Sequence, residues 1–226
     1  MYIMGKLTDV NLNKEGISTV MSNVAGKVPP IFQQLEYVRF SGDATGYLHD
    51  LIITGLLRTG AGTIKADVMM SIDKQQNRTY SGNIASADLN VGKLLDNEKK
   101  FGTADFNLEL KGFNYKNHYP ESYIKGNIAS FEYSQYKYEN IALDGVYKDG
   151  GFNGKLAMDD DNGSVQINGN FNVACAIPEF NLKAVLKNLR PDNLHLSDKY
   201  KDTDISLNVT ADFTGCLLYT SPSPRD

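Results

Sequence analysis

Residues 136–173 decide the fold, and they read YKYENIALDGVYKDGGFNGKLAMDDDNGSVQINGNFNV. Apolar and polar side chains alternate in three runs, at 136–147, 151–158 and 164–173. This period of two places successive side chains on opposite faces of a strand. The runs are separated by Asp149-Gly150-Gly151 and by Asp161-Asn162-Gly163. Because such glycine-containing turns join neighbouring antiparallel strands, the stretch predicts an antiparallel meander.

The same alternation extends over most of the chain, in both directions from this stretch. It recurs at 37–48, 63–73, 103–112, 122–133, 179–187 and 203–214. Helical spacing of apolar residues is confined to 14–25, with further turns expected at 30–36, 91–96 and 191–196. The sequence therefore predicts a mostly β protein, a long antiparallel meander with a few short helices.

A glycine stands between two apolar residues at seven places in the chain, in the pattern apolar-x-Gly-x-apolar. The seven are Gly42, Gly55, Gly82, Gly126, Gly145, Gly154 and Gly169. Residues two apart share a face of a strand, so each glycine lies on the apolar face. Glycine weakens a strand interior, and its repeated use predicts either a tightly coiled sheet or close approach by another group. The two explanations are compatible.

Composition excludes several classes of protein. The chain has 226 residues, of which 41% are hydrophobic and 22% charged, with a net charge of -4. These fractions are those of a globular protein, and an acidic balance disfavours nucleic-acid binding. Two cysteines are too few for a disulfide framework, and neither lies in a zinc-binding pattern.

The two halves of the chain share a weak repeat of roughly a hundred residues. Asp88 to Leu95 precedes the strand 103–112, and Asn188 to Leu196 precedes the strand 203–214 in the same way. At the end of the chain, residues 216–226 read CLLYTSPSPRD and resemble a translated sequencing adapter. We expect this tail to be non-native, and we expect residues 1–215 to be a segment of a longer protein.

A long sheet with one apolar face must bury that face. Three solutions remain open, namely a two-sheet sandwich, a closed barrel and an open sheet curled around an apolar ligand. The aromatic residues fall in the middle of strands as often as at their ends, which disfavours a transmembrane barrel.

The chain resembles the AsmA-like superfamily, and within it the TamB-like proteins of the diderm bacterial envelope. The resemblance rests on the glycine-centred strands, on Asp9 to Leu12 and Asp88 to Val91, on the helical insertion at about 14–36, and on Phe213-Thr-Gly215. It implies an open, twisted, U-shaped groove in a periplasmic protein anchored in the inner membrane. It further implies a role in moving phospholipid to the outer membrane and in outer-membrane biogenesis, with an Omp85-type barrel protein as partner.

Sixteen apolar residues are expected to share the concave face and to contact phospholipid acyl chains. They are Val38, Phe40, Ile53, Ile64, Val68, Met70, Phe106, Leu108, Ile124, Ile128, Leu143, Leu156, Ile167, Phe171, Leu182 and Leu207. The competing hypothesis is a carbohydrate-binding or adhesive β-sandwich, whose two apolar faces close on each other.

Catalytic and metal-binding patterns are not expected. The three histidines, His49, His118 and His195, are far apart in the sequence, and the run 159–163 lacks the spacing of a calcium loop. Four tyrosines form a concentration that fits cross-strand pairs better than a carbohydrate platform, namely Tyr133, Tyr136, Tyr138 and Tyr147. We therefore predict a protein that is not an enzyme and has no cofactor.

Overall fold

The computed structural model describes residues 2–25, 30–47, 49–114, 120–172, 179–197, 199 and 201–214. Twelve strands form one sheet in chain order. They are β1 Tyr2–Asn13, β2 Tyr37–Tyr47, β3 Asp50–Thr59, β4 Gly62–Ile72, β5 Arg78–Asn90, β6 Phe101–Asn114, β7 Glu121–Tyr133, β8 Tyr136–Lys148, β9 Gly151–Asp160, β10 Gly163–Asn172, β11 Glu179–Leu189 and β12 Ile205–Thr214. The expected tail at 216–226 and His118 lie outside the described residues.

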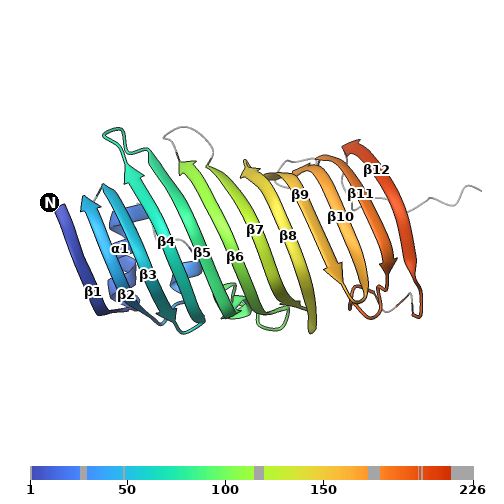
Figure 1. The fold of residues 1–226 in the computed structure, drawn as a ribbon, viewed down its shortest axis with the longest axis horizontal. Coiled ribbons are helices and arrows are strands. Elements are labelled where there is room, and N and C mark those ends of the chain that lie inside the picture. Colours follow the sequence, from blue (N-terminus) through green and yellow to red (C-terminus); the bar gives the residue numbers. More distant parts are fainter. Residues whose placement is uncertain are drawn as a thin grey trace, which may run out of the picture.

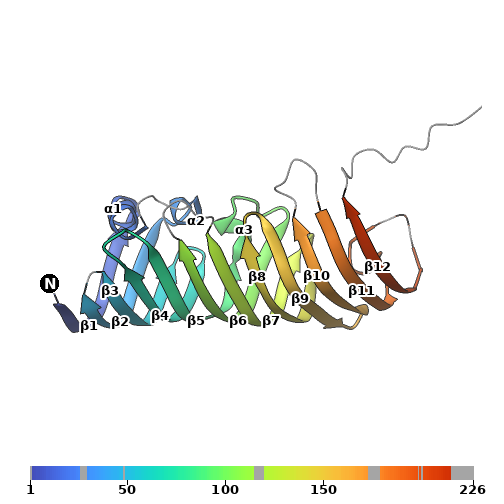
Figure 2. The same cartoon turned by 90° about the horizontal axis from the view of Figure 1, so that it is seen from above.

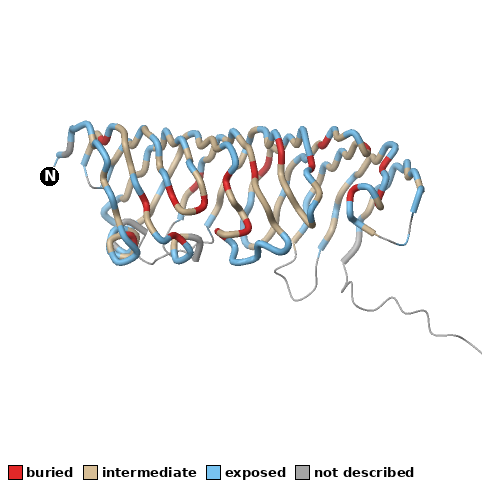
Figure 3. The backbone as a smooth tube through the Cα atoms, turned by 90° about the horizontal axis from the view of Figure 1, so that it is seen from below, coloured by how far each residue is buried: buried red, intermediate tan, exposed pale blue. Residues whose placement is uncertain are grey.

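The predicted fold class is confirmed. Every described strand pairs antiparallel with its neighbours in sequence, and the first and last strands do not meet, so the sheet is open (Figure 1). The sheet is twisted and curls along its length into a U-shaped groove (Figures 2 and 3). Because the described strands form a single sheet, they do not build the two-sheet sandwich considered above.

Three short helices lie on the open side of the groove (Figure 2). Helix α1, Lys14–Ala25, has the predicted bounds, and α2 spans Pro30–Gln33. Helix α3, Val91–Leu94, begins where the side chain of Asn90 accepts a hydrogen bond from the Lys93 amide, at 2.7 Å. None of the described helices has the length and apolar character needed to span a membrane.

Two apolar clusters hold the covering segments on the sheet. The first joins Ile17 of α1, Leu35 after α2 and Leu94 of α3 to Val38 and Leu89 of the sheet. The second consists of Tyr138, Met158, Leu189 and Leu194, and Leu194 has no exposed surface. The first cluster lies beneath the helices, and the second lies between 190–197 and the strands β8, β9 and β11. Figure 3 shows buried positions along the groove.

The weak sequence repeat corresponds to a repeated structure. Asp88 and Asn188 both have positive φ angles, of 55° and 49°, and both interrupt the register of their strand by a β-bulge. The Asp88 amide donates to the Asp105 carboxylate at 2.5 Å, and the Asn188 amide donates to the Ser206 hydroxyl at 2.9 Å. The bulge leaves this backbone amide without a partner in the strand-to-strand hydrogen bonding. In each case a side chain on the neighbouring strand accepts its hydrogen bond instead.

The bulge at Asp88 makes stability depend on pH. Hydrogen bonds from the Asp88 amide and then from the Ser130 hydroxyl lower the pKa of Asp105 below its ordinary value of 3.8. A carboxyl with a lowered pKa contributes stability above its ordinary pKa and loses it as the pH falls through the folded-state value. We therefore expect the substitution Asp105→Asn to destabilise the protein more at pH 7 than at pH 3, measured by urea unfolding. An equal effect at both pH values would contradict this role of the ionised carboxylate.

Candidate functional site

The strand register defines which side chains share the concave face, because directly paired residues of antiparallel strands point to the same side. Paired residues form rows that cross the sheet at right angles to the strands. Row 2 crosses all twelve strands and contains Leu7, Gly42, Gly55, Ala66, Ile84, Leu108, Gly126, Leu143, Leu156, Ile167, Ala184 and Val209. Row 3 lies beside it and contains Gly5, Ala44, Ile53, Val68, Gly82, Leu110, Ile124, Gly145, Gly154, Gly169, Leu182 and Ala211.

Two further rows flank these. Row 1, on the side of the helices, contains Val10, Phe40, Leu57, Ile64, Ser86, Phe106, Ile128, Ile141, Met158, Val165, Leu186 and Leu207. Row 4, on the side of the hairpins, runs from β2 to β11 and contains Gly46, Leu51, Met70, Tyr80, Gly112, Ser122, Tyr147, Phe152, Phe171 and Phe180. No residue of the four rows is charged, so they form a continuous uncharged track.

The structure brings all sixteen predicted lining residues to this face. Fifteen belong to rows 1 to 4, and Val38 lies one position nearer the helices, opposite Leu12 and Thr59. Most of the fifteen are half-buried, although no second sheet covers them among the described strands. Cross-strand neighbours cover these side chains in part, and Ile64 and Phe106 also pack against the first cluster. The most open stretch is in β8–β12, where Leu156, Phe171 and Leu207 are 37%, 39% and 38% exposed.

The seven predicted glycines also lie on this face, in rows 2 and 3. At two places an aromatic ring occupies the space above them. The ring of Phe40 covers Gly42 and Gly55, and the ring of Phe152 covers Gly145 and Gly154. Glycine is thus needed where a large neighbouring ring lies against the backbone of the sheet.

Gly82 supplies a stability prediction with an internal control. Its φ is +150°, and a Cβ atom at this position would lie 2.0 Å from the Asp67 carbonyl oxygen. We expect Gly82→Ala to lower the free energy of unfolding by about 3 kcal/mol, through strain and a displaced strand. At Gly5 a Cβ would meet nothing within 4 Å, so Gly5→Ala should change stability by less than about 0.5 kcal/mol. Urea unfolding of both variants tests this, and equal effects would contradict it.

The four tyrosines of the sequence concentration do not form one platform. Tyr133 and Tyr136 are cross-strand partners, as the pairing interpretation expects, and Tyr138 is buried in the second cluster. Tyr136 donates to Asp160 and Tyr138 donates to the Leu194 carbonyl. Burial raises the pKa of both hydroxyls, to about 12 for Tyr136, so both stay protonated at neutral pH. Tyr147 lies apart in row 4 and is 48% exposed.

Sequence reasoning missed two features of this face. One is the run of aromatic residues Tyr147, Phe152, Phe171 and Phe180, which are successive partners across β8–β11. The rings of Phe152 and Phe171 lie 5.7 Å apart. The other is the cover formed by 190–197. The sequence does not predict this cover, because its contacts with β8 depend on a strand register that the sequence does not show.

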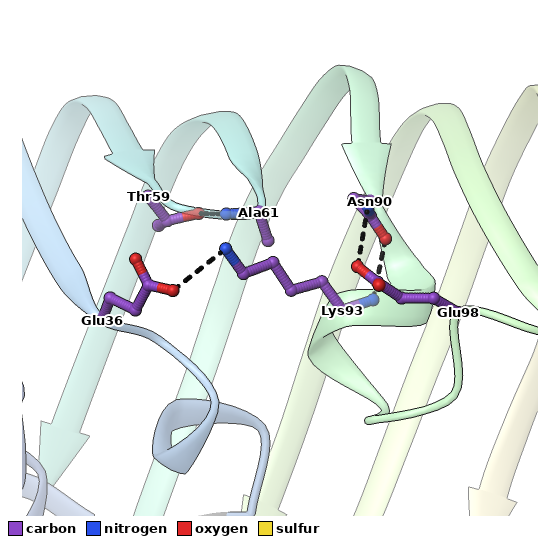
Figure 4. A network of polar contacts seen from close by, with 6 residues as sticks. All are labelled: Glu36, Thr59, Ala61, Asn90, Lys93 and Glu98. Atoms are coloured by element: carbon purple, nitrogen blue, oxygen red, sulfur yellow. Dashed lines mark hydrogen bonds and ion pairs between the residues drawn. The ribbon is translucent and has the colours of Figure 1, made fainter.

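One hollow of the described surface lies outside the track. It has a volume of about 540 Å³ and lies between the segment around α1 and α2 and the loop after α3. Its lining contains both signs of charge, including Lys14, Glu36 and Glu98. Figure 4 shows Lys93 crossing this region to pair with Glu36, at 3.3 Å. We assign the candidate site to the track, because only the track is continuous over all twelve strands.

Among the described residues, no group of three or more His, Cys, Asp or Glu side chains has the geometry of a metal site. Comparisons with protein-family models, with curated proteins and with solved structures found no match to this chain. Function must therefore be inferred from the geometry of the concave face.

Proposed function

We propose that this chain is a segment of a lipid-transfer protein that shields phospholipid acyl chains on the concave face of its sheet. The uncharged track across twelve strands carries the proposal. With strands about 4.8 Å apart, the track is about 53 Å long. A surface of this kind suits a long, flexible, apolar ligand better than a compact one.

The energetics of an acyl chain agree with this proposal. Each CH₂ group removed from water contributes about 0.8 kcal/mol, so a whole chain exposed to water is strongly disfavoured. Moving along an unbroken apolar row, a chain exchanges one set of apolar neighbours for the next. A charged side chain in the rows would interrupt this exchange, and rows 1 to 4 contain none.

In the wider setting suggested by the resemblance, the segment would belong to a bridge between the inner and outer membranes of a diderm envelope. Lipid would pass along the groove, and an Omp85-type barrel protein would be its outer-membrane partner. The function would then be the supply of phospholipid for outer-membrane biogenesis.

Native mass spectrometry of the full chain, purified without harsh detergent, tests the proposal. We expect species that carry one or more phospholipids, which chloroform–methanol extraction releases and identifies. A lipid-free monomer that does not take up phospholipid from vesicles would overturn the proposal. If that monomer bound glycans instead, the carbohydrate-binding hypothesis would replace it.

A further inference from the structure

Row 3 contains a run of three glycines on successive strands. Gly145, Gly154 and Gly169 are direct partners across β8, β9 and β10, and we call them the glycine floor. Because glycine has no Cβ atom, no side chain of these three residues stands on the concave face. The glycine floor is therefore a strip of bare backbone about 10 Å long within the apolar track.

Large uncharged side chains border the glycine floor on both sides. On the same three strands, row 2 contributes Leu143, Leu156 and Ile167, and row 4 contributes Tyr147, Phe152 and Phe171. The two rows are four residues apart along each strand, a distance of about 13 Å. The floor thus lies lower than its two borders by the length of their side chains.

The ring of Phe152 lies on part of the glycine floor. Phe152 stands two residues before Gly154 on β9, and its side chain leans along the strand over Gly154 and Gly145. A Cβ atom at Gly154 would lie 3.0 Å from the Cζ atom of this ring, and at Gly145 the same ring is the nearest group. At Gly169 none of the three nearest atoms belongs to an aromatic ring. The ring therefore covers two of the three glycines.

The exposed neighbours of Phe152 give its ring a second apolar surface on which to pack. The rings of Phe152 and Phe171 lie 5.7 Å apart, and Phe171 is 39% exposed. Tyr147, the direct partner of Phe152 on β8, is 48% exposed. Phe152 belongs to neither apolar cluster of the described residues. A ring that turns towards row 4 exchanges its contact with the floor for contact with these aromatic side chains.

We infer that the glycine floor binds one acyl chain of a phospholipid, and that Phe152 is a gate residue, which covers the floor when the groove is empty. This inference rests on the proposed function and adds the place of binding and its control. In the empty groove the ring keeps water from the backbone of the floor, and a bound chain does the same once the ring has turned towards row 4. Because a chain binds only where the floor is open, the gate weakens the apparent affinity in proportion to the open fraction.

Removal of the ring tests the gate. We expect Phe152→Ala in the full chain to bind phospholipid about tenfold more tightly, as follows if about a tenth of the unmodified molecules have an open floor. The matched control is Phe180→Ala in row 4, because the ring of Phe180 is not among the atoms nearest to any glycine of the floor. We expect this control to bind no more tightly than the unmodified protein. The probe is a phosphatidylethanolamine with a fluorophore on its headgroup, supplied in phosphatidylcholine vesicles.

Fluorine NMR of the intact ring supplies a test that does not depend on the folding of Phe152→Ala. A 4-fluorophenylalanine is placed either at position 152 or at position 40, and the spectra are compared before and after loading with phosphatidylcholine. The ring of Phe40 also covers two glycines, but it lies next to the first cluster, whose member Val38 is 7% exposed. We expect the fluorine signal at position 152 to shift on loading and the signal at position 40 to change less.

The two experiments separate the gate from lipid binding itself. An unchanged signal at position 152 in the loaded protein, or an equally large shift at position 40, would overturn the gate and leave lipid binding intact. Equal affinities of Phe152→Ala and Phe180→Ala would do the same. If neither the unmodified protein nor Phe152→Ala binds phospholipid, the proposed function fails and the gate fails with it.

Discussion

The substitution Leu156→Asp is expected to remove most of the bound phospholipid while the protein still folds. Leu156 lies in row 2 between its partners Leu143 and Ile167, and it is 37% exposed. A carboxylate there would be covered by an acyl chain, with no cation in the rows to pair with it. Burying such a charge costs at least about 1.4–2.8 kcal/mol, which corresponds to a tenfold to hundredfold loss of affinity.

The matched control is Asn168→Asp, which adds the same charge on the opposite face of the sheet. Asn168 is exposed and lies between Lys155 and Lys183 on the neighbouring strands. We expect this variant to retain lipid and to fold normally. Lipid is quantified by extraction and mass spectrometry, and folding by circular dichroism and urea unfolding. Equal lipid loss in both variants would contradict the track, and unfolding of Leu156→Asp alone would indicate a dry core in its place.

The structure also explains why Leu156 is a better target than other residues of the same face. Phe40 and Ile128 are equally apolar positions of row 1. The ring of Phe40 covers two glycines, so its removal would disturb the sheet as well as the track. Leu156 has an exposed side chain in the most open stretch, which separates an effect on binding from an effect on folding.

Local sequence patterns were sufficient to predict nine of the twelve strands, most of the turns and the face that each predicted lining residue occupies. The alternation did not single out β1, β3 and β5 as strands. The alternation in 151–158 and 164–173, for example, places Leu156 and Ile167 on one face, and the turn at Asp161 to Gly163 aligns them as partners. The apolar spacing in 14–25 likewise predicts α1 with its observed bounds. These features depend on residues that are close together in the chain, so a single sequence is enough to predict them.

The alignment of rows across the whole sheet is not a local property. The run of Gly145, Gly154 and Gly169 in row 3 requires the register of two successive hairpins to be known. The cover formed by 190–197 is still harder to predict from the sequence, because its Leu194 carbonyl accepts a hydrogen bond from Tyr138, a residue 56 positions away. The weak repeat was the available signal, since it pairs the segment of Leu194 with that of the buried Leu94.

The buried side chain of Leu194 supplies a second large expected effect on stability. Leu194 has no exposed surface and packs with Tyr138, Met158 and Leu189. We expect Leu194→Ala to lower the free energy of unfolding by about 3 kcal/mol, because the removed methyl groups leave a cavity in a tightly packed cluster. Leu196, two residues further along, is 53% exposed, so Leu196→Ala should cost less than about 0.5 kcal/mol.

Urea unfolding measures both leucine variants, and hydrogen exchange shows where Leu194→Ala acts. If this cluster holds 190–197 on the sheet, the amides of 190–197 should exchange faster than those of β5 and β6 in this variant. A Leu194→Ala protein with wild-type stability and unchanged exchange at 190–197 would show that the cluster does not hold this segment on the sheet.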